Sequence, residues 1–176
     1  HLLAHTSGCR EAFTLPAYGP GIDDTTRPTA ALLDLVMREP LVFRPGARWS
    51  YSNSNYALLA AVVERATGVP YDAFLREALL APNGIASVHH CAPLPTAPHH
   101  ARGYALAGGA VRPSPPENMH WTRGDGGLCA DAVDLARWGR ALAAGRAVSY
   151  ASYQRMTASD RVADGTRPAY GFALSL

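Results

Sequence analysis

Apolar residues between Ser54 and Gly68 recur at the spacing of one face of an α-helix, and this segment constrains the fold most. Serine is a residue type that caps helix N-termini, and glycine is favoured just after the last turn of a helix. The pattern therefore predicts a helix that begins near Ser54 and stops at Gly68. Its apolar positions are Leu59, Val62, Val63 and Ala66.

Further helices are expected on both sides of this segment. Apolar stripes predict one helical region over 28–85 and a second over 131–157. In the second region Asp131 fits an N-cap position, with Asp134 three residues further on as in a capping box. The predicted buried face of this helix consists of Leu135, Trp138 and Leu142.

The rest of the chain is predicted to form loops and short strands. Proline, glycine and histidine are frequent over 91–127, and weak alternation around Gly108-Gly109 predicts a β-hairpin there. The segment 11–27 has the composition of a loop. Residues 169–176 have the pattern of a strand at the start of a sheet.

The chain contains no lysine, and its sixteen basic residues are all arginine. This absence excludes a P-loop, a Schiff-base lysine and a Ser-x-x-Lys nucleophile pair within the 176 residues. The formal net charge of +2 is too small to indicate a nucleic-acid partner. No apolar run approaches the roughly 20 residues of a membrane-spanning helix, so no transmembrane segment is expected.

Cysteine and histidine residues are interpreted here as structural rather than metal-binding. Three cysteines lie far apart at Cys9, Cys91 and Cys129, so we expect small apolar side chains and no disulfide framework. Histidine pairs occur at His89-His90 and His99-His100, but without a recognised zinc spacing. We therefore expect neither a metal site nor a cofactor.

The tripeptide Tyr51-Ser52-Asn53 precedes the predicted central helix and is a candidate catalytic motif. A tyrosine phenol can take and return a proton where neighbouring cations lower its pKa. An asparagine two residues further on offers a donor and an acceptor, which suits an amide carbonyl. The spacing alone also fits an ordinary helix cap with a packed tyrosine.

Three segments occur in an order that is shared with a known family. Tyr51 to Ile85 contains Tyr-x-Asn, a leucine-rich helix ending in Thr-Gly, and a second helix ending in a Pro-Leu-Gly-like turn, with Asn83 in place of the leucine. Residues 1–8 have the sequence His-Leu-Leu-Ala-His-Thr-Ser-Gly, and 126–136 begin with Gly-Gly-Leu. Together these segments resemble the serine hydrolases of the class C β-lactamase and D-alanyl-D-alanine peptidase type.

The resemblance implies a mixed α/β (α+β) fold of the β-lactamase and transpeptidase kind. A helical subdomain would pack on an antiparallel sheet, and 1–176 would form one incomplete domain that is mostly helical. Tyr51 would transfer protons and Asn53 would hydrogen-bond the catalytic lysine and the substrate carbonyl. Gly126, and Trp121 in the preceding loop, are expected to bind substrate.

The resemblance also implies parts that this chain does not contain. A Ser-x-x-Lys pair would precede His1, and a His/Lys-x-Gly strand would follow Leu176. We therefore expect an acyl-enzyme hydrolase in the full-length protein and an inactive isolated chain. The substrate would be a small molecule or peptide with an amide or ester bond, such as a β-lactam, a D-Ala-D-Ala peptide or an ester. A periplasmic, secreted or membrane-tethered location is expected.

An alternative hypothesis is a non-catalytic relative that binds peptidoglycan or D-peptides without turnover. Such a protein could keep the fold while losing the nucleophile. The presence of both Tyr51 and Asn53 favours the enzyme, because a decayed site need not keep both.

Overall fold

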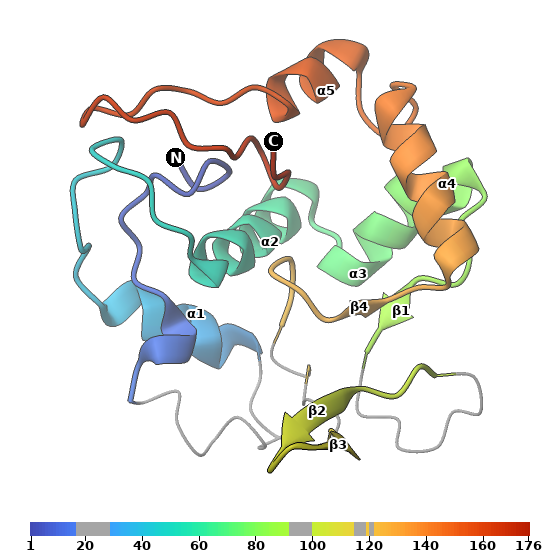
Figure 1. Ribbon diagram of the computed structural model, residues 1–176. Helices are drawn as coiled ribbons and strands as arrows, with labels where there is room; N and C mark the ends of the chain where they lie inside the picture. The colour runs from blue at the N-terminus through green and yellow to red at the C-terminus, as the bar shows by residue number, and fades with distance from the viewer. Residues whose placement is uncertain (17–28, 92–99, 115–118, 120–121) are drawn as a thin grey trace.

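Helix α2 (Asn53–Thr67) lies at the centre of the molecule, with the other helices arranged around it (Figure 1). The computed structural model describes residues 1–16, 29–91, 100–114, 119 and 122–176. Both chain ends lie on the same side of α2 (Figure 1), and His1 and Tyr170 line one groove. The flanking helices are α1 (Thr29–Arg38), α3 (Tyr71–Phe74), α4 (Ala132–Ala143) and α5 (Tyr150–Met156).

The central helix forms where the sequence predicts it, but its capping differs. Its C-cap is Gly68, as predicted, but its N-cap is Ser52. Ser54, predicted to be the cap, lies inside the first turn, where its Oγ accepts the Ala12 N–H at 2.9 Å. Val62 is 54% exposed, so the apolar stripe is not the buried face. The buried residues are Ser54, Asn55, Ala57 and Ala60.

A small hydrophobic core joins α1 to α2. Leu32 and Val36 of α1 are buried against Ala57 of α2. Ala12 and Leu15 complete this core from a short 3-10 turn, Ala12–Thr14. The segment that its composition assigned to a loop therefore contributes to the core, because Ala12 and Leu15 pack against the two helices.

A second group of helical segments begins with α3 and includes α4. Helix α3 continues as a π-helical segment (Leu75–Leu80) and a 3-10 turn (Ala81–Asn83) before Gly84. Asp131 caps α4 and accepts the Asp134 N–H at 2.7 Å, as predicted.

The buried face of α4 differs from the predicted one. Leu142 is buried as predicted, but Leu135 is 64% exposed, and Asp134 and Ala141 are buried instead. Asp134 turns this face inward because its carboxylate accepts the Ala86 and Ser87 N–H groups at 2.9 and 2.8 Å.

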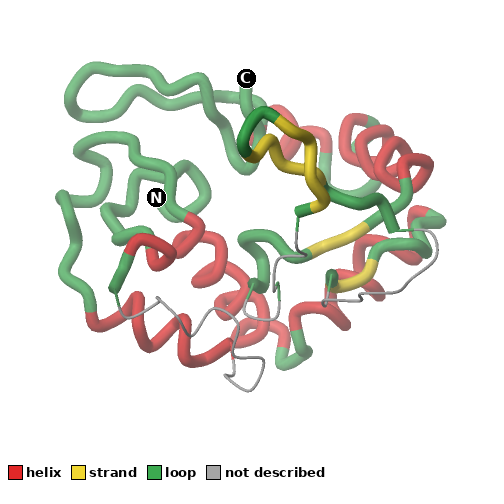
Figure 2. Tube along the Cα trace, turned by 60° about the horizontal axis from the view of Figure 1, so that its bottom comes forward, coloured by secondary structure: helices red, strands yellow, loops and turns green. Residues whose placement is uncertain are grey.

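Among the described residues the strands, yellow in Figure 2, form two separate antiparallel pairs. The predicted hairpin is confirmed: β2 (Tyr104–Ala107) pairs with β3 (Ala110–Pro113) around the two glycines. The second pair joins β1 (His89–His90) to β4 (Leu128–Cys129), and a disulfide links Cys91 to Cys129. The expectation of no disulfide was wrong, because strand pairing brings these two Cα atoms to 5.3 Å. Cys9 is free.

Residues 169–176 form a turn where a strand was expected. A single antiparallel bridge joins Tyr170 to Ser175, and the Gly171 N–H donates to Leu174 O at 2.8 Å. The Phe172 N–H donates to Met156 O at the end of α5. The segment therefore satisfies its backbone groups locally and on α5. No helix in the described ranges combines the length and apolarity needed to cross a membrane.

Replacing Asp134 by alanine should lower the melting temperature on the order of 5 °C or more, because two backbone N–H groups lose their acceptor. Thermal unfolding followed by circular dichroism measures the change. The control is Asp160→Ala, which removes an exposed ion pair to Arg155 and should shift the melting temperature by about 2 °C or less. Equal shifts for the two variants would contradict the anchoring role of Asp134.

Candidate active site

Tyr51 and Asn53 lie together at the start of α2. The Tyr51 hydroxyl donates to Asn53 Oδ1 at 3.1 Å, and the Tyr51 side chain is 50% exposed. The Asn53 backbone N–H donates to Glu11 Oε2 at 2.5 Å, which holds the first residue of the helix. The tripeptide thus places a solvent-accessible phenol against an amide, an arrangement that can pass a proton and bind a carbonyl.

Behind Tyr51 lies an aromatic cluster centred on His5. The ring centroid of His5 is 4.3 Å from that of Tyr51, 5.1 Å from that of Tyr56 and 5.0 Å from that of Tyr170. Trp49 lies at its edge, 6.3 Å from His5. Segments from the start, middle and end of the chain therefore meet around His5.

His5 is joined to α2 by a buried hydrogen-bond network. The Ser52 N–H donates to His5 Nδ1 at 3.2 Å, and Asn55 Nδ2 lies 3.1 Å from the same atom. The Ser7 hydroxyl donates to Asn55 Oδ1 at 2.5 Å. All four side chains are buried, so these bonds are shielded from water. Burial lowers the pKa of His5 to about 4, and its imidazole stays neutral at pH 7.

The other two tyrosines of the cluster are held in their protonated form. Burial, followed by the proximity of Tyr170, raises the pKa of Tyr56, whose hydroxyl donates to Leu3 O at 2.8 Å. Burial, followed by the proximity of Tyr51, raises the pKa of Tyr170. Of these three phenols, Tyr51 is the one that contacts the Asn53 side chain.

Gly8 allows the segment that carries His5 and Ser7 to pass close to the following loop. Its φ is +81°, and a Cβ atom there would lie 2.1 Å from Phe43 O. Both the positive φ and the lack of space restrict this position to glycine. The Val42 N–H donates to Gly8 O at 2.9 Å, which fixes the contact.

The loop 122–127 carries the predicted substrate-binding Gly126 and packs on α2. At Gly124 a Cβ would lie 2.6 Å from Tyr56 O and 2.8 Å from Ala60 Cβ. Gly126 is exposed, and a Cβ there would meet no atom within 4 Å. Trp121, the other predicted substrate-binding residue, lies outside the described residues.

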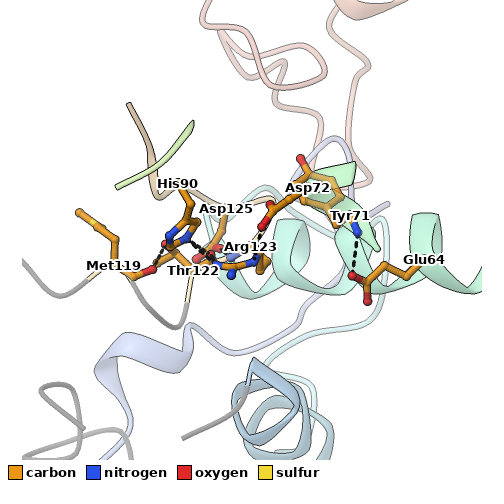
Figure 3. Close-up of polar contacts among 8 residues, drawn as sticks. All are labelled: Glu64, Tyr71, Asp72, His90, Met119, Thr122, Arg123 and Asp125. Carbon is orange, nitrogen blue, oxygen red and sulfur yellow. Dashed lines mark hydrogen bonds and ion pairs between the residues drawn. The ribbon is translucent and has the colours of Figure 1, made fainter. Parts of the chain in front are cut away.

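Arg123 fixes this loop to its neighbours, as Figure 3 shows. Its guanidinium pairs with Asp72 of α3 at 3.1 Å and donates to Thr122 O at 2.8 Å and to His90 Nε2 at 2.5 Å. The Arg123 N–H donates to Asp125 Oδ1 at 2.9 Å. The loop is therefore bound both to α3 and to strand β1.

Asp125 is a carboxylate that the sequence did not single out. Its Oδ2 is buried and has no hydrogen-bond partner in the described part of the chain. Burial raises the pKa of Asp125 to about 6; the Arg123 N–H opposes the rise and the charge of Glu11 adds to it. Glu11 also accepts the Asn53 N–H. The same carboxylate of Glu11 therefore raises the pKa of Asp125 and holds the start of α2.

The ring nitrogens of His89 and His90 face backbone carbonyl groups. His89 Nδ1 lies 2.7 Å from Ser87 O, and His90 Nε2 lies 2.9 Å from Thr122 O. Within 1–16, 29–91, 100–114, 119 and 122–176, no three His, Cys, Asp or Glu side chains gather in a way that could hold a metal ion.

Sequence patterns missed two residues that shape this site. His5 belongs to the His-Thr-Ser-Gly segment. That segment supported the family resemblance, but it gave no indication of what the His5 side chain does. Glu11 lies in the segment assigned to a loop, and no local pattern signals its bond to Asn53. Only the packing of the N-terminal segment on α2 brings both residues to the tripeptide.

Comparison with known proteins assigns this chain to a family. The sequence profile of the Beta-lactamase family matches residues 1–176. The chain is 31% identical over 134 residues to a D-aminopeptidase of Brucella canis, covering 75% of this chain and 25% of that protein. The chain thus spans about a quarter of the length of this curated relative.

Two solved structures share the fold. A D-stereospecific amidohydrolase from Streptomyces sp. superposes with a TM-score of 0.77 at 26% identity, over 97% of this chain and 54% of that one. The D-amino acid amidase of Ochrobactrum anthropi SV3, complexed with L-phenylalanine, superposes with a TM-score of 0.73 at 26% identity, over 89% and 45%. The chain belongs to the Beta-lactamase family, and the expected mixed helix-and-sheet fold is confirmed.

Replacing Asp125 by asparagine should stabilise the chain at high pH. The raised pKa means that the folded state disfavours the ionised carboxylate, so stability is lost as the pH rises through about 6. Asparagine cannot ionise but still accepts the Arg123 N–H. We expect the free energy of unfolding to rise on the order of 2 kcal/mol at pH 8 relative to the unmodified chain, and by about zero at pH 4.

Urea denaturation at the two pH values measures this difference. The control is Asp164→Asn: the N–H and then the hydroxyl of Thr166 lower the pKa of Asp164, so this substitution should give no gain at pH 8. A gain for Asp125→Asn of the same size at both pH values would show that ionisation is not its cause.

Proposed function

We propose that this chain is part of an acyl-enzyme serine hydrolase in which Tyr51 transfers protons and Asn53 orients the substrate. The observation that carries the proposal is the bond from the Tyr51 hydroxyl to Asn53 Oδ1 at the start of α2. An accessible phenol held by an amide suits proton transfer at an acyl carbon. Membership in the Beta-lactamase family supports this chemistry.

The proposed reaction needs a nucleophile that these 176 residues do not supply. A serine of a Ser-x-x-Lys pair, located elsewhere in the full-length protein, would attack the acyl carbon and lose its proton to the relay that includes Tyr51. The relay returns a proton to the leaving amine as the bond to carbon breaks. Water then attacks the acyl-enzyme, releasing the acid and the free serine.

Amides of D-amino acids are the proposed substrate class. Relatives of this chain are named D-aminopeptidase, D-stereospecific amidohydrolase and D-amino acid amidase. In this proposal the Asn53 side chain binds the acyl-side carbonyl or amide, and Gly126 lines the cleft. The open space at Gly126 leaves room for a substrate beside the loop.

Replacing Tyr51 by phenylalanine in the full-length protein should lower kcat for a D-amino acid amide by roughly 100-fold or more, because general acid–base catalysis contributes on that order. Asn53→Ala should lower kcat/KM. Release of the amine measures both effects. Tyr150→Phe is the control, since Tyr150 is a 63% exposed tyrosine on α5. Unchanged turnover in Tyr51→Phe would reject the proton-transfer role.

The isolated chain should not react with a fluorophosphonate or a labelled β-lactam, because it contains no Ser-x-x-Lys pair. Mass spectrometry of the intact chain after incubation detects a covalent adduct. A stoichiometric adduct would contradict the proposal that the nucleophile lies elsewhere. If the full-length protein binds D-peptides but forms no adduct either, the binding-module hypothesis is favoured.

A further inference from the structure

His5 is a fully buried histidine to which the proposed reaction assigns no role. Its exposure is 0%, and its Nε2 atom has no hydrogen-bond partner among the described residues. Leaving a polar atom buried without a partner is unfavourable, so its presence calls for a physical reason. The contacts at the other ring nitrogen, Nδ1, fix the orientation of the ring and thereby the position of Nε2.

Two donors converge on His5 Nδ1. One is the backbone N–H of Ser52 at 3.2 Å, and the other is Nδ2 of Asn55 at 3.1 Å. The Ser7 hydroxyl binds Asn55 Oδ1 and thereby turns Nδ2 toward the histidine. A backbone N–H can only donate, so Nδ1 is unprotonated and the single ring proton is on Nε2.

We propose that His5 is a positioning residue that holds Tyr51 in its catalytic orientation, through the bond from Ser52 to Nδ1 and through contact between the two rings. This inference rests on the proposed role of Tyr51. The Tyr51 ring lies against the imidazole with centroids 4.3 Å apart and planes 35° apart. The Ser52 N–H belongs to the residue between Tyr51 and Asn53, so one bond constrains the backbone of the whole tripeptide.

The neutral imidazole is required for this role. A proton on Nδ1 would turn the acceptor into a donor and oppose the Ser52 N–H. In the part of the chain that the structure describes, the titratable groups in contact with the ring are the phenols of Tyr51, Tyr56 and Tyr170, and none of these is a carboxylate that could balance an imidazolium. Burial keeps His5 neutral across the neutral pH range.

The tautomer can be tested on the 176-residue chain itself. Long-range 1H–15N correlation spectra should show His5 protonated on Nε2 alone from pH 7.5 down to about 5. Loss of its signals in His5→Asn assigns them. A proton on Nδ1, or protonation of His5 above pH 6, would overturn the inference. This measurement is independent of activity, so it separates failure of the inference from failure of the proposed function.

Paired substitutions in the full-length protein test the positioning role. In His5→Asn the amide oxygen can lie close to the position of Nδ1 and accept the Ser52 N–H, whereas leucine in His5→Leu cannot. We expect kcat to fall roughly 10- to 100-fold in His5→Leu, with KM changed less than about threefold and kcat largely restored in His5→Asn. The exposed His100, replaced by leucine, is the control.

Stability measurements separate positioning from folding. Melting temperatures are recorded for each variant, and kcat is measured well below them. A kcat for His5→Leu equal to that of the unmodified protein would overturn the inference. So would equal losses of kcat in both His5 variants, because the acceptor at Nδ1 would then be irrelevant. If His5→Leu does not fold, His5→Asn and the tautomer spectra decide.

Discussion

The hydrogen bonds between the N-terminal segment and the first turn of α2 are the interaction on which the candidate site depends. The Ser52 N–H binds His5 Nδ1, the Ser7 hydroxyl binds Asn55, and the Ala12 N–H binds Ser54 Oγ. A typical buried hydrogen bond contributes about 1 kcal/mol net, but an unpaired partner left behind costs about 1–3 kcal/mol. Because these groups are buried, losing one partner would strand another, and the segment and the helix therefore hold one another in register.

This constraint explains why small and polar residues form the buried face of α2. Ser54 accepts a backbone N–H of the N-terminal segment, and Asn55 bonds the side chains of His5 and Ser7. Ala57 and Ala60 let neighbouring segments approach closely. Larger apolar residues such as Val62 lie on the outer face. Polar contacts fix the first turn of α2, and this positions Tyr51 and Asn53 at the start of the helix.

The loop 122–127, which carries the proposed substrate-binding Gly126, is fixed by charge instead. Arg123 binds the loop 122–127 to Asp72, and the disulfide between Cys91 and Cys129 joins the two strands that enclose this loop. In this loop the Oδ2 atom of Asp125 is buried, and burial raises the pKa of this carboxyl. In the proposed function, the phenol and amide at the start of α2 and the glycine-rich loop both contribute to a site whose nucleophile lies elsewhere in the protein.

The sequence by itself determined the elements whose signals are local. The glycine stop of α2, the Asp131 cap of α4 and the hairpin at Gly108-Gly109 all follow from spacing, capping and turn preferences. Only the tertiary structure decided which faces are buried, that Cys91 and Cys129 bond, that residues 169–176 turn back, and that His5 and Glu11 reach the site. Each of these depends on contacts between residues far apart in the chain, whose energies exceed local preferences and leave no periodic signal.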